Sequence, residues 1–291
     1  MKLGYCSWLL GGKSLPETFK FLNDEGCTCV SILQNIMEFD KGEKAEAAAF
    51  LKEKGMTLCV HGNAQHKLTP AKDGFDEDFI KALYDEIDWW DEATGGLLYD
   101  CFSDSINDWT AEGERCSRIE LSHDLFRRHA KHFAGTKIRY GIENTCGSPD
   151  PHSRAFYNCD ERFQEAYDLF GSDRNAGLLL DVGHAYVASI TQGIDFETYL
   201  DSIPLEICEL HITDNHGKKD EHLKPGAGTL DYRALKNAMM KRGFKGPVNM
   251  EVCKNISEGI YGFDLSQQAD FDFVRTVLAE ARELFADFSS N

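Results

Sequence analysis

Residues 177–184, "GLLLDVGH", combine an unbroken apolar run with a carboxylate and an imidazole at the end of the run. A strand that is covered on both faces needs such a continuous run, whereas a strand with one solvent-exposed face alternates apolar and polar residues. Asp181 and His184 therefore mark the point where a buried strand gives way to a loop. The stretch predicts a parallel sheet with polar side chains at the carboxyl end of its strands.

Runs of this kind recur along the chain and are separated by amphipathic segments with helical spacing. The eight runs cover residues 2–7, 27–33, 56–62, 96–102, 138–144, 177–184, 206–213 and 247–253. The expected helices cover residues 15–25, 43–54, 76–91, 114–134, 160–170, 195–202, 231–242 and 264–287. Strands that alternate with helices form parallel sheets with crossover helices. Eight such units in a chain of 291 residues are typical of a (β/α)8 TIM barrel.

A doubly wound open sheet is the alternative α/β architecture. Such a sheet usually carries a glycine-rich phosphate-binding turn after its first strand. The corresponding turn here reads "CSWLLGGKSLP" (6–16) and lacks the G-x-G-x-x-G spacing. No composition break, long linker or internal repeat divides the chain. We therefore expect a single TIM barrel domain over residues 1–291.

Composition and charge narrow the class of protein further. A hydrophobic content of 42% suits a large packed core rather than disorder. The 49 acidic and 31 basic residues give a formal charge of −18, which repels phosphate backbones, so no nucleic-acid partner is expected. No apolar window is long enough to span a membrane, and the N-terminus lacks the apolar run of a signal peptide.

The ten cysteines are scattered, mostly among apolar neighbours, and form no C-x-x-C pair. This pattern fits neither a zinc ribbon nor a thioredoxin-like motif. Buried, reduced thiols are the simplest interpretation, and they are typical of a cytosolic protein. We therefore expect a cytoplasmic location.

Polar residues end several predicted strands on the side where TIM barrels carry their chemistry. Four of them lie near the ends of four successive runs: Glu143, Asp181, His211 and Glu251. Taken singly, each could pair with a buried arginine or a backbone carbonyl. Together, three carboxylates and one imidazole form an oxygen-rich set that suits Mn²⁺, Mg²⁺ or Co²⁺, and also Zn²⁺. The sequence thus predicts one divalent metal site at this four-residue set.

Four segments resemble signature segments of the xylose isomerase-like TIM barrel superfamily. They are "YGIENT" (140–145), "LLLDVGHAY" (178–186), "LHITDNHGKKDEHLKPGAGTLD" (210–231) and "VNMEVC" (248–253). They most resemble its branch of sugar or sugar-phosphate isomerases and epimerases, which is related to the AP endonuclease family 2. The resemblance covers about residues 140–253, and the N-terminal half matches only in strand rhythm and in His61.

The resemblance implies roles for individual residues. The four-residue set would bind a catalytic divalent cation, and His184 would contact substrate or metal. Asp220 and His222 would complete a second metal subsite or hold substrate hydroxyls. Trp8 and His61 are further candidates for substrate binding, in a pocket of mixed aromatic and polar character.

The same loop contains other residues with structural roles. Asp214 is expected either to shape the loop or to orient His211, because metal-bound imidazoles usually have a hydrogen-bond partner. The glycines that follow permit a sharp turn. Asp231 is expected to cap the next helix.

The chemistry expected of this metal site is proton transfer at carbon. A cation chelated by two adjacent sugar oxygens acidifies the neighbouring C–H and stabilises an enediolate. Glu143 and Glu251 are the expected acid–base pair. The predicted function is a divalent-metal-dependent isomerase or epimerase of a sugar, sugar phosphate or polyol. Dehydration of a sugar acid could use the same residues. The expected partner is a small carbohydrate, and the chain could also form a homo-oligomer.

Two alternatives come from other functional classes. A metal-dependent AP endonuclease would need a three-zinc cluster with more histidines, including one after the fourth strand. That strand ends "LLYDCFSD" (97–104) without a histidine. A non-catalytic barrel could bind a sugar or a partner protein, but it would have no need of the Glu143 and Glu251 pair.

Overall fold

Parallel strands surrounded by helices make up the part of the chain that the computed structural model describes. This part comprises residues 2–10, 13–33, 40–62, 77–96, 123–146, 160–254 and 270–286. Its strands are β1 (Lys2–Tyr5), β2 (Cys29–Leu33), β3 (Thr57–His61), β4 (Tyr140–Glu143), β5 (Ala176–Asp181), β6 (Ile207–Ile212) and β7 (Pro247–Met250). The predicted strand at 96–102 lies, apart from Gly96, outside the described residues.

The strands pair in the order expected of a barrel. The order β1-β7-β6-β5-β4 forms one sheet, β2 and β3 form another, and each pairing is parallel. A parallel bridge between Cys6 and Ser31 connects the two sheets. Because β1 pairs with β7, the first and last described strands lie side by side, as closure of a barrel requires.

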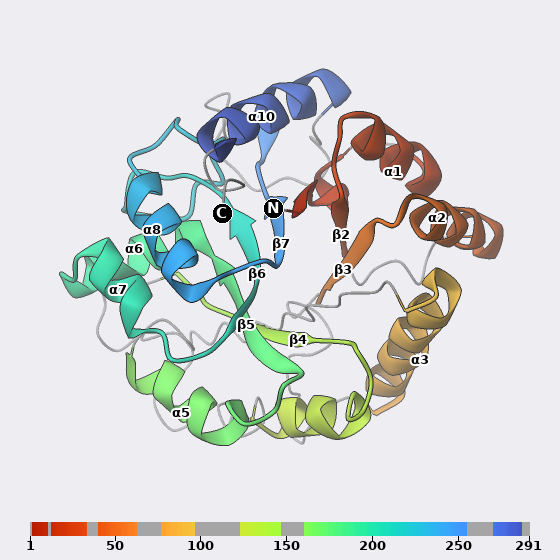
Figure 1. The fold of residues 1–291 in the computed structure, drawn as a ribbon, viewed down its shortest axis with the longest axis horizontal. Helices are drawn as coiled ribbons and strands as arrows, with labels where there is room; N and C mark the ends of the chain where they lie inside the picture. The colour runs from red at the N-terminus through yellow and green to blue at the C-terminus, as the bar shows by residue number, and fades with distance from the viewer. Residues whose placement is uncertain are drawn as a thin grey trace.

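The helices form an outer ring around the strands (Figure 1). They are α1 (Leu15–Asp24), α2 (Lys41–Lys54), α3 (Glu77–Thr94), α5 (Asp160–Phe170), α6 (Val182–Gln192), α7 (Phe196–Ser202), α8 (Tyr232–Arg242) and α10 (Phe271–Leu284). Residues 123–132 are also helical, and a short 3-10 helix, η1, covers Ser7–Leu9. Among the described helices, none is long and apolar enough to cross a membrane.

One helix differs from the sequence-based expectation. The apolar pattern extends a strand through His184, but β5 ends at Asp181 and α6 begins at Val182. Asp181 caps this helix, because its carboxylate accepts a hydrogen bond from the backbone N–H of His184. A short apolar run does not distinguish a buried strand from the first turns of a buried helix. The chain therefore turns from strand to helix at Asp181, which is itself a predicted metal ligand.

The barrel interior is well packed. Strands β5 and β6 are buried along their whole length, as strands covered on both faces should be. The cysteines that lie among apolar neighbours are buried and carry free thiols, in line with the prediction: Cys6, Cys27, Cys29, Cys59, Cys208 and Cys253.

Candidate metal centre

The four-residue set converges at the carboxyl ends of the strands. Glu143 ends β4, Asp181 ends β5, His211 is the penultimate residue of β6, and Glu251 directly follows β7. Each offers one ligand atom, and these atoms lie within 4.8 Å of one another. All four side chains belong to residues that are at most 7% exposed. The structure thus brings together residues that are up to 108 positions apart in the sequence.

The strand register explains this convergence. Asp181 on β5 is the direct partner of His211 on β6. The backbone N–H of Glu251 donates to the carbonyl of Ile212, which continues the pairing of β6 with β7. Parallel strands in adjacent positions end at the same edge of a sheet, so their last side chains share one space.

His211 lies between two carboxylates. Its Nδ1 is 3.0 Å from Glu251 Oε2, and its Nε2 is 3.2 Å from Glu209 Oε1. Burial opposes the charged imidazolium, but the nearby side chains of Cys6 and Glu251 outweigh burial and raise the pKa of His211 well above its usual value. Glu209 was not among the site residues predicted from the sequence. The E-x-H spacing within one strand was the available signal, because residues two apart share a face.

The two glutamates of the set are paired with imidazoles. His61 Nε2 is 3.5 Å from Glu143 Oε2. Burial raises the pKa of Glu143, but His61, together with His184 and His211, more than offsets this effect and lowers the pKa to about 2. Burial likewise opposes ionisation of Glu251, and His211 lowers its pKa below the usual value. Both glutamates are therefore ionised at neutral pH.

Asp181 shows that the set fits a cation. One carboxylate oxygen accepts from the N–H of His184 at 2.7 Å, whereas Oδ2 is buried without a hydrogen-bond partner among the described residues. Burial raises the pKa of Asp181 to about 6, since Glu251 adds to burial and His184 only partly opposes it. An orphaned, buried carboxylate oxygen costs free energy unless a cation or a proton satisfies it. A divalent cation among these oxygens would remove that cost.

The predicted substrate-binding residues form a polar wall beside this set. Asp220 Oδ2 is 2.6 Å from His222 Nε2 and 3.3 Å from His184 Nε2. Burial opposes ionisation of Asp220, but the two imidazoles hold its pKa far below the usual range. Asp220 in turn raises the pKa of His222 to about 10, against the effect of burial. Cys146 forms a group with His184 and Asp220 that could hold a metal ion. Cys146 was not among the site residues predicted from the sequence.

The loop that carries Asp220 is closed by Asp214. The Asp214 carboxylate accepts from the backbone N–H groups of Asn215, Gly226 and Leu230 at 2.8, 2.9 and 3.2 Å. The His211 nitrogens face Glu251, Glu209 and Cys6, so the structure favours the other expected role of Asp214, which is to shape the loop. Asp231 caps α8 as predicted, through the N–H groups at the start of that helix.

Aromatic and imidazole rings cover another side of the set. Trp8 in η1 lies with its ring centroid 5.1 Å from that of His61 and 6.2 Å from that of His211. The Nδ1 of His61 is 2.8 Å from the carbonyl oxygen of Gly62, which fixes the direction of the ring. Trp8 and His61 thus lie beside the predicted metal ligands, although they come from the opposite end of the sequence.

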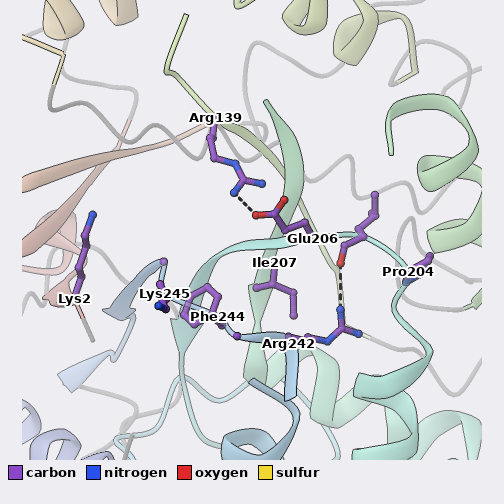
Figure 2. A pocket seen from close by; sticks show the side chains of 11 residues that line it. Lys2, Arg139, Pro204, Glu206, Ile207, Arg242, Phe244 and Lys245 are labelled. Carbon is purple, nitrogen blue, oxygen red and sulfur yellow. Dashed lines mark hydrogen bonds and ion pairs between the residues drawn. The ribbon is translucent and has the colours of Figure 1, made fainter. Parts of the chain in front are cut away.

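A cavity of about 490 Å³ lies at the other end of the strands and has a different character (Figure 2). Its cationic side chains include Arg139, which pairs with Glu206. Arg242 donates to the carbonyl oxygens of Leu200 and Ile203 at 2.7 and 2.6 Å. Arg242 thus ties the end of α8 to α7 and to the segment that follows α7. The amino-terminal face of a barrel usually serves stability, so we assign the chemistry to the carboxyl end.

Comparisons with known proteins agree with the fold. A family model described as xylose isomerase-like TIM barrel matches residues 19–271. An uncharacterised protein of Methanocaldococcus jannaschii is 28% identical over 111 residues, which are 38% of this chain and 36% of that protein. The match therefore spans about a third of the relative.

Solved structures resemble the whole chain at low sequence identity. A D-psicose 3-epimerase from Clostridium cellulolyticum, solved with D-tagatose, has a TM-score of 0.70 at 15% identity and covers 100% of this chain and 98% of its own. A xylose isomerase domain protein from Alicyclobacillus acidocaldarius reaches 0.69 at 18% identity, covering 98% and 99%. The IOLI protein with a bound zinc atom reaches 0.65 at 15% identity, covering 100% and 98%. These likenesses confirm the predicted TIM barrel fold.

Proposed function

Because this chain belongs to the xylose isomerase-like TIM barrel family, we propose that it is a divalent-metal-dependent sugar isomerase or epimerase. The observation that carries the proposal is the buried convergence of the four-residue set at the carboxyl ends of the strands. The similar D-psicose 3-epimerase was solved with D-tagatose, and the similar IOLI protein with a zinc atom. Both findings support a sugar substrate and a divalent cation here.

Four side chains would hold the cation: Glu143, Asp181, His211 and Glu251. Their three carboxylates and one imidazole suit Mn²⁺, Mg²⁺, Co²⁺ or Zn²⁺. When bound, such a cation polarises a sugar carbonyl and acidifies the hydrogen on the neighbouring carbon. Because the set is buried, the surrounding protein would strengthen this effect by excluding water.

Glu143 and Glu251 would transfer the proton. Glu143 on β4 and Glu251 after β7 lie on either side of the central strands β5 and β6, so they flank the set. Both carboxylates are ionised, so each has the basic oxygen that a proton acceptor needs. One would remove a proton from carbon and the other would return one. Return to the same carbon gives epimerisation, and return to its neighbour gives isomerisation.

The surrounding residues would bind and orient the sugar. His184, Asp220 and His222 form a linked polar wall that can donate to and accept from hydroxyl groups. The Trp8 ring, beside His61, offers an apolar surface on which the C–H face of a sugar can pack. This combination suits a small polyhydroxylated substrate.

Metal analysis of the purified protein, paired with a substrate screen, tests the proposal. We expect stoichiometric divalent metal in the wild type, sharply reduced metal in His211→Ala, and activity on a ketose, aldose or polyol that a chelator abolishes. Solvent deuterium should enter the product if a proton is exchanged at carbon. Equal metal content in the two proteins, or full activity after metal removal, would refute the proposal.

A further inference from the structure

Glu209 is a buried carboxylate that the proposed reaction does not use. It lies on β6 and is 0% exposed. Because residues two apart on a strand share a face, Glu209 lies on the same face of β6 as His211, one layer deeper in the barrel. A carboxylate inside a barrel is costly unless its interactions compensate for lost hydration. Its presence therefore needs an explanation.

The contacts of Glu209 lead to the proposed metal site. Its Oε1 lies 3.2 Å from His211 Nε2 and accepts a hydrogen bond from Asn249 Nδ2 at 2.7 Å. The Cys29 thiol is 3.5 Å from Asn249 Oδ1, on the far side of this amide. A Cβ at Gly4 would lie 2.3 Å from Asn249 Oδ1, so the glycine leaves the space that Asn249 occupies. Four strands thus shape one polar layer under His211.

His211 can place only one nitrogen toward the four-residue set. Nδ1 is 3.0 Å from Glu251 Oε2, which belongs to the set. Nε2 is 3.2 Å from Glu209 Oε1 and 4.0 Å from Cys6 Sγ, and neither of these residues belongs to the set. Metal binding requires the neutral imidazole, so His211 must lose the proton that its raised pKa favours without metal. The neutral ring carries one proton, and its other nitrogen is then the potential metal ligand. With the proton on Nδ1, the ring would donate to Glu251 and withdraw two ligand atoms at once. With the proton on Nε2, both remain available.

We propose that Glu209 is a positioning residue that accepts the Nε2–H of His211 and so directs the Nδ1 lone pair toward the cation. This role rests on the proposed function, since it concerns the same metal site. Metal-binding histidines usually donate their second N–H to a carboxylate, carbonyl or water, which fixes the tautomer and raises ligand basicity. Asn249 holds the Glu209 carboxylate in place for this purpose.

Two variants and one matched control test the role of Glu209. Glu209→Leu removes the acceptor, and Glu209→Gln keeps a weaker, uncharged acceptor. Cys208→Ala is the control. Cys208 is the neighbouring buried residue of the same strand, its thiol donates to the carbonyl of Leu178, and adjacent residues of a strand point to opposite faces. Circular dichroism and urea unfolding of chelator-treated protein measure the structural effect of each change separately from metal binding.

The first measurement is Zn²⁺ affinity, determined by competition with a chromophoric chelator. Removing such a partner typically weakens metal binding by about 10–100-fold, and we expect this loss for Glu209→Leu. Glu209→Gln should show a smaller loss, on the order of 3–10-fold, because an amide oxygen is a weaker acceptor than a carboxylate. Cys208→Ala should bind Zn²⁺ as the wild type does.

The second measurement is the imidazole N–H signal of His211 in Zn²⁺-loaded protein with ¹⁵N-labelled histidine, assigned by its loss in His211→Ala. The wild type should show a downfield, slowly exchanging Nε2–H signal. This signal should move upfield in Glu209→Gln and broaden or disappear in Glu209→Leu. If Glu209→Leu does not fold, the affinity and the signal of Glu209→Gln decide the question.

The outcomes separate the two proposals. Wild-type Zn²⁺ affinity and an unchanged His211 signal in the Glu209 variants would overturn the positioning role and leave the proposed function standing. A wild type that binds no divalent metal would overturn both.

Discussion

Single carboxylate–imidazole pairs set the charge state of the candidate site. Glu143 pairs with His61, and Glu251 pairs with His211, in each case across two different strands. Within each pair the imidazole holds the carboxylate ionised against the effect of burial. Removing one partner of such a buried pair leaves an uncompensated charge, which is usually strongly destabilising. Conservative substitutions of these site residues are therefore the most informative tests of their roles.

Glu143→Gln and Glu251→Gln test the acid–base role directly. Glutamine keeps the size and one oxygen donor but removes the basic site, so metal should be retained, although more weakly. We expect turnover to fall by about 10²–10⁴, the usual contribution of general acid–base catalysis. If the enzyme is an epimerase, each variant should lose solvent deuterium wash-in from one epimer more than from the other.

An exposed glutamate provides the control for this pair. Glu283→Gln near the end of α10 changes the same chemical group at the surface and should leave turnover unchanged. Absence of solvent exchange in the wild type and in both variants would indicate a hydride shift. That result would remove both glutamates from proton transfer while leaving the metal site intact.

The loop between β6 and α8 is the element that places the polar wall. Asp214 anchors it at both ends, through backbone N–H groups that are up to 16 residues away. An antiparallel bridge between Asp214 and Leu223 supports the segment that carries Asp220 and His222. Gly228 lies so close to the carbonyl of Asn215 that a Cβ would sit 2.3 Å from its oxygen. The loop is therefore held by its backbone as much as by its side chains.

Asp214→Ala tests this anchoring role. The substitution leaves buried N–H groups without their acceptor, so the free energy of unfolding should fall by about 1–3 kcal/mol, as urea denaturation would measure. Metal affinity should change little, because Glu251 and Glu209 hold His211. The KM for the sugar should rise, because Asp220 and His222 lose their placement.

Asp231→Ala is the matched control on the same loop. Loss of this helix cap should cost about 1 kcal/mol without changing KM. A loss of metal from Asp214→Ala at unchanged stability would restore the view that Asp214 orients His211.

The whole molecule carries a formal charge of −18. This charge bears on the alternative function, which is cleavage of DNA by an AP endonuclease. An acidic surface repels the phosphate backbone of DNA, and phosphate contacts supply much of the affinity of DNA-binding proteins. We therefore expect no incision of an abasic-site duplex at moderate salt, measured on denaturing gels with Mg²⁺, Mn²⁺ or Zn²⁺ added. Efficient, metal-dependent incision would favour the AP endonuclease alternative over the sugar enzyme.

Much of the architecture was predictable because local rules determine it. Strands that are buried on both faces need continuous apolar runs, and parallel strands need helical crossovers. The boundary at Asp181 was missed because the chain turns from strand to helix within one apolar run. Within the described residues, the other strand positions agree with the pattern to within a few residues.

The sequence by itself determined that four residues would lie at or near the ends of neighbouring strands, since each lies near the end of an apolar run: Glu143, Asp181, His211 and Glu251. Only the tertiary structure decided the partner of each side chain. The contacts of His211 with Glu251 and of Glu209 with Asn249 each join residues 40 positions apart. Barrel closure and strand register fix such contacts, and no local pattern of residues specifies them. For the same reason Asp214, which is near His211 in the sequence, serves the loop instead of the metal site.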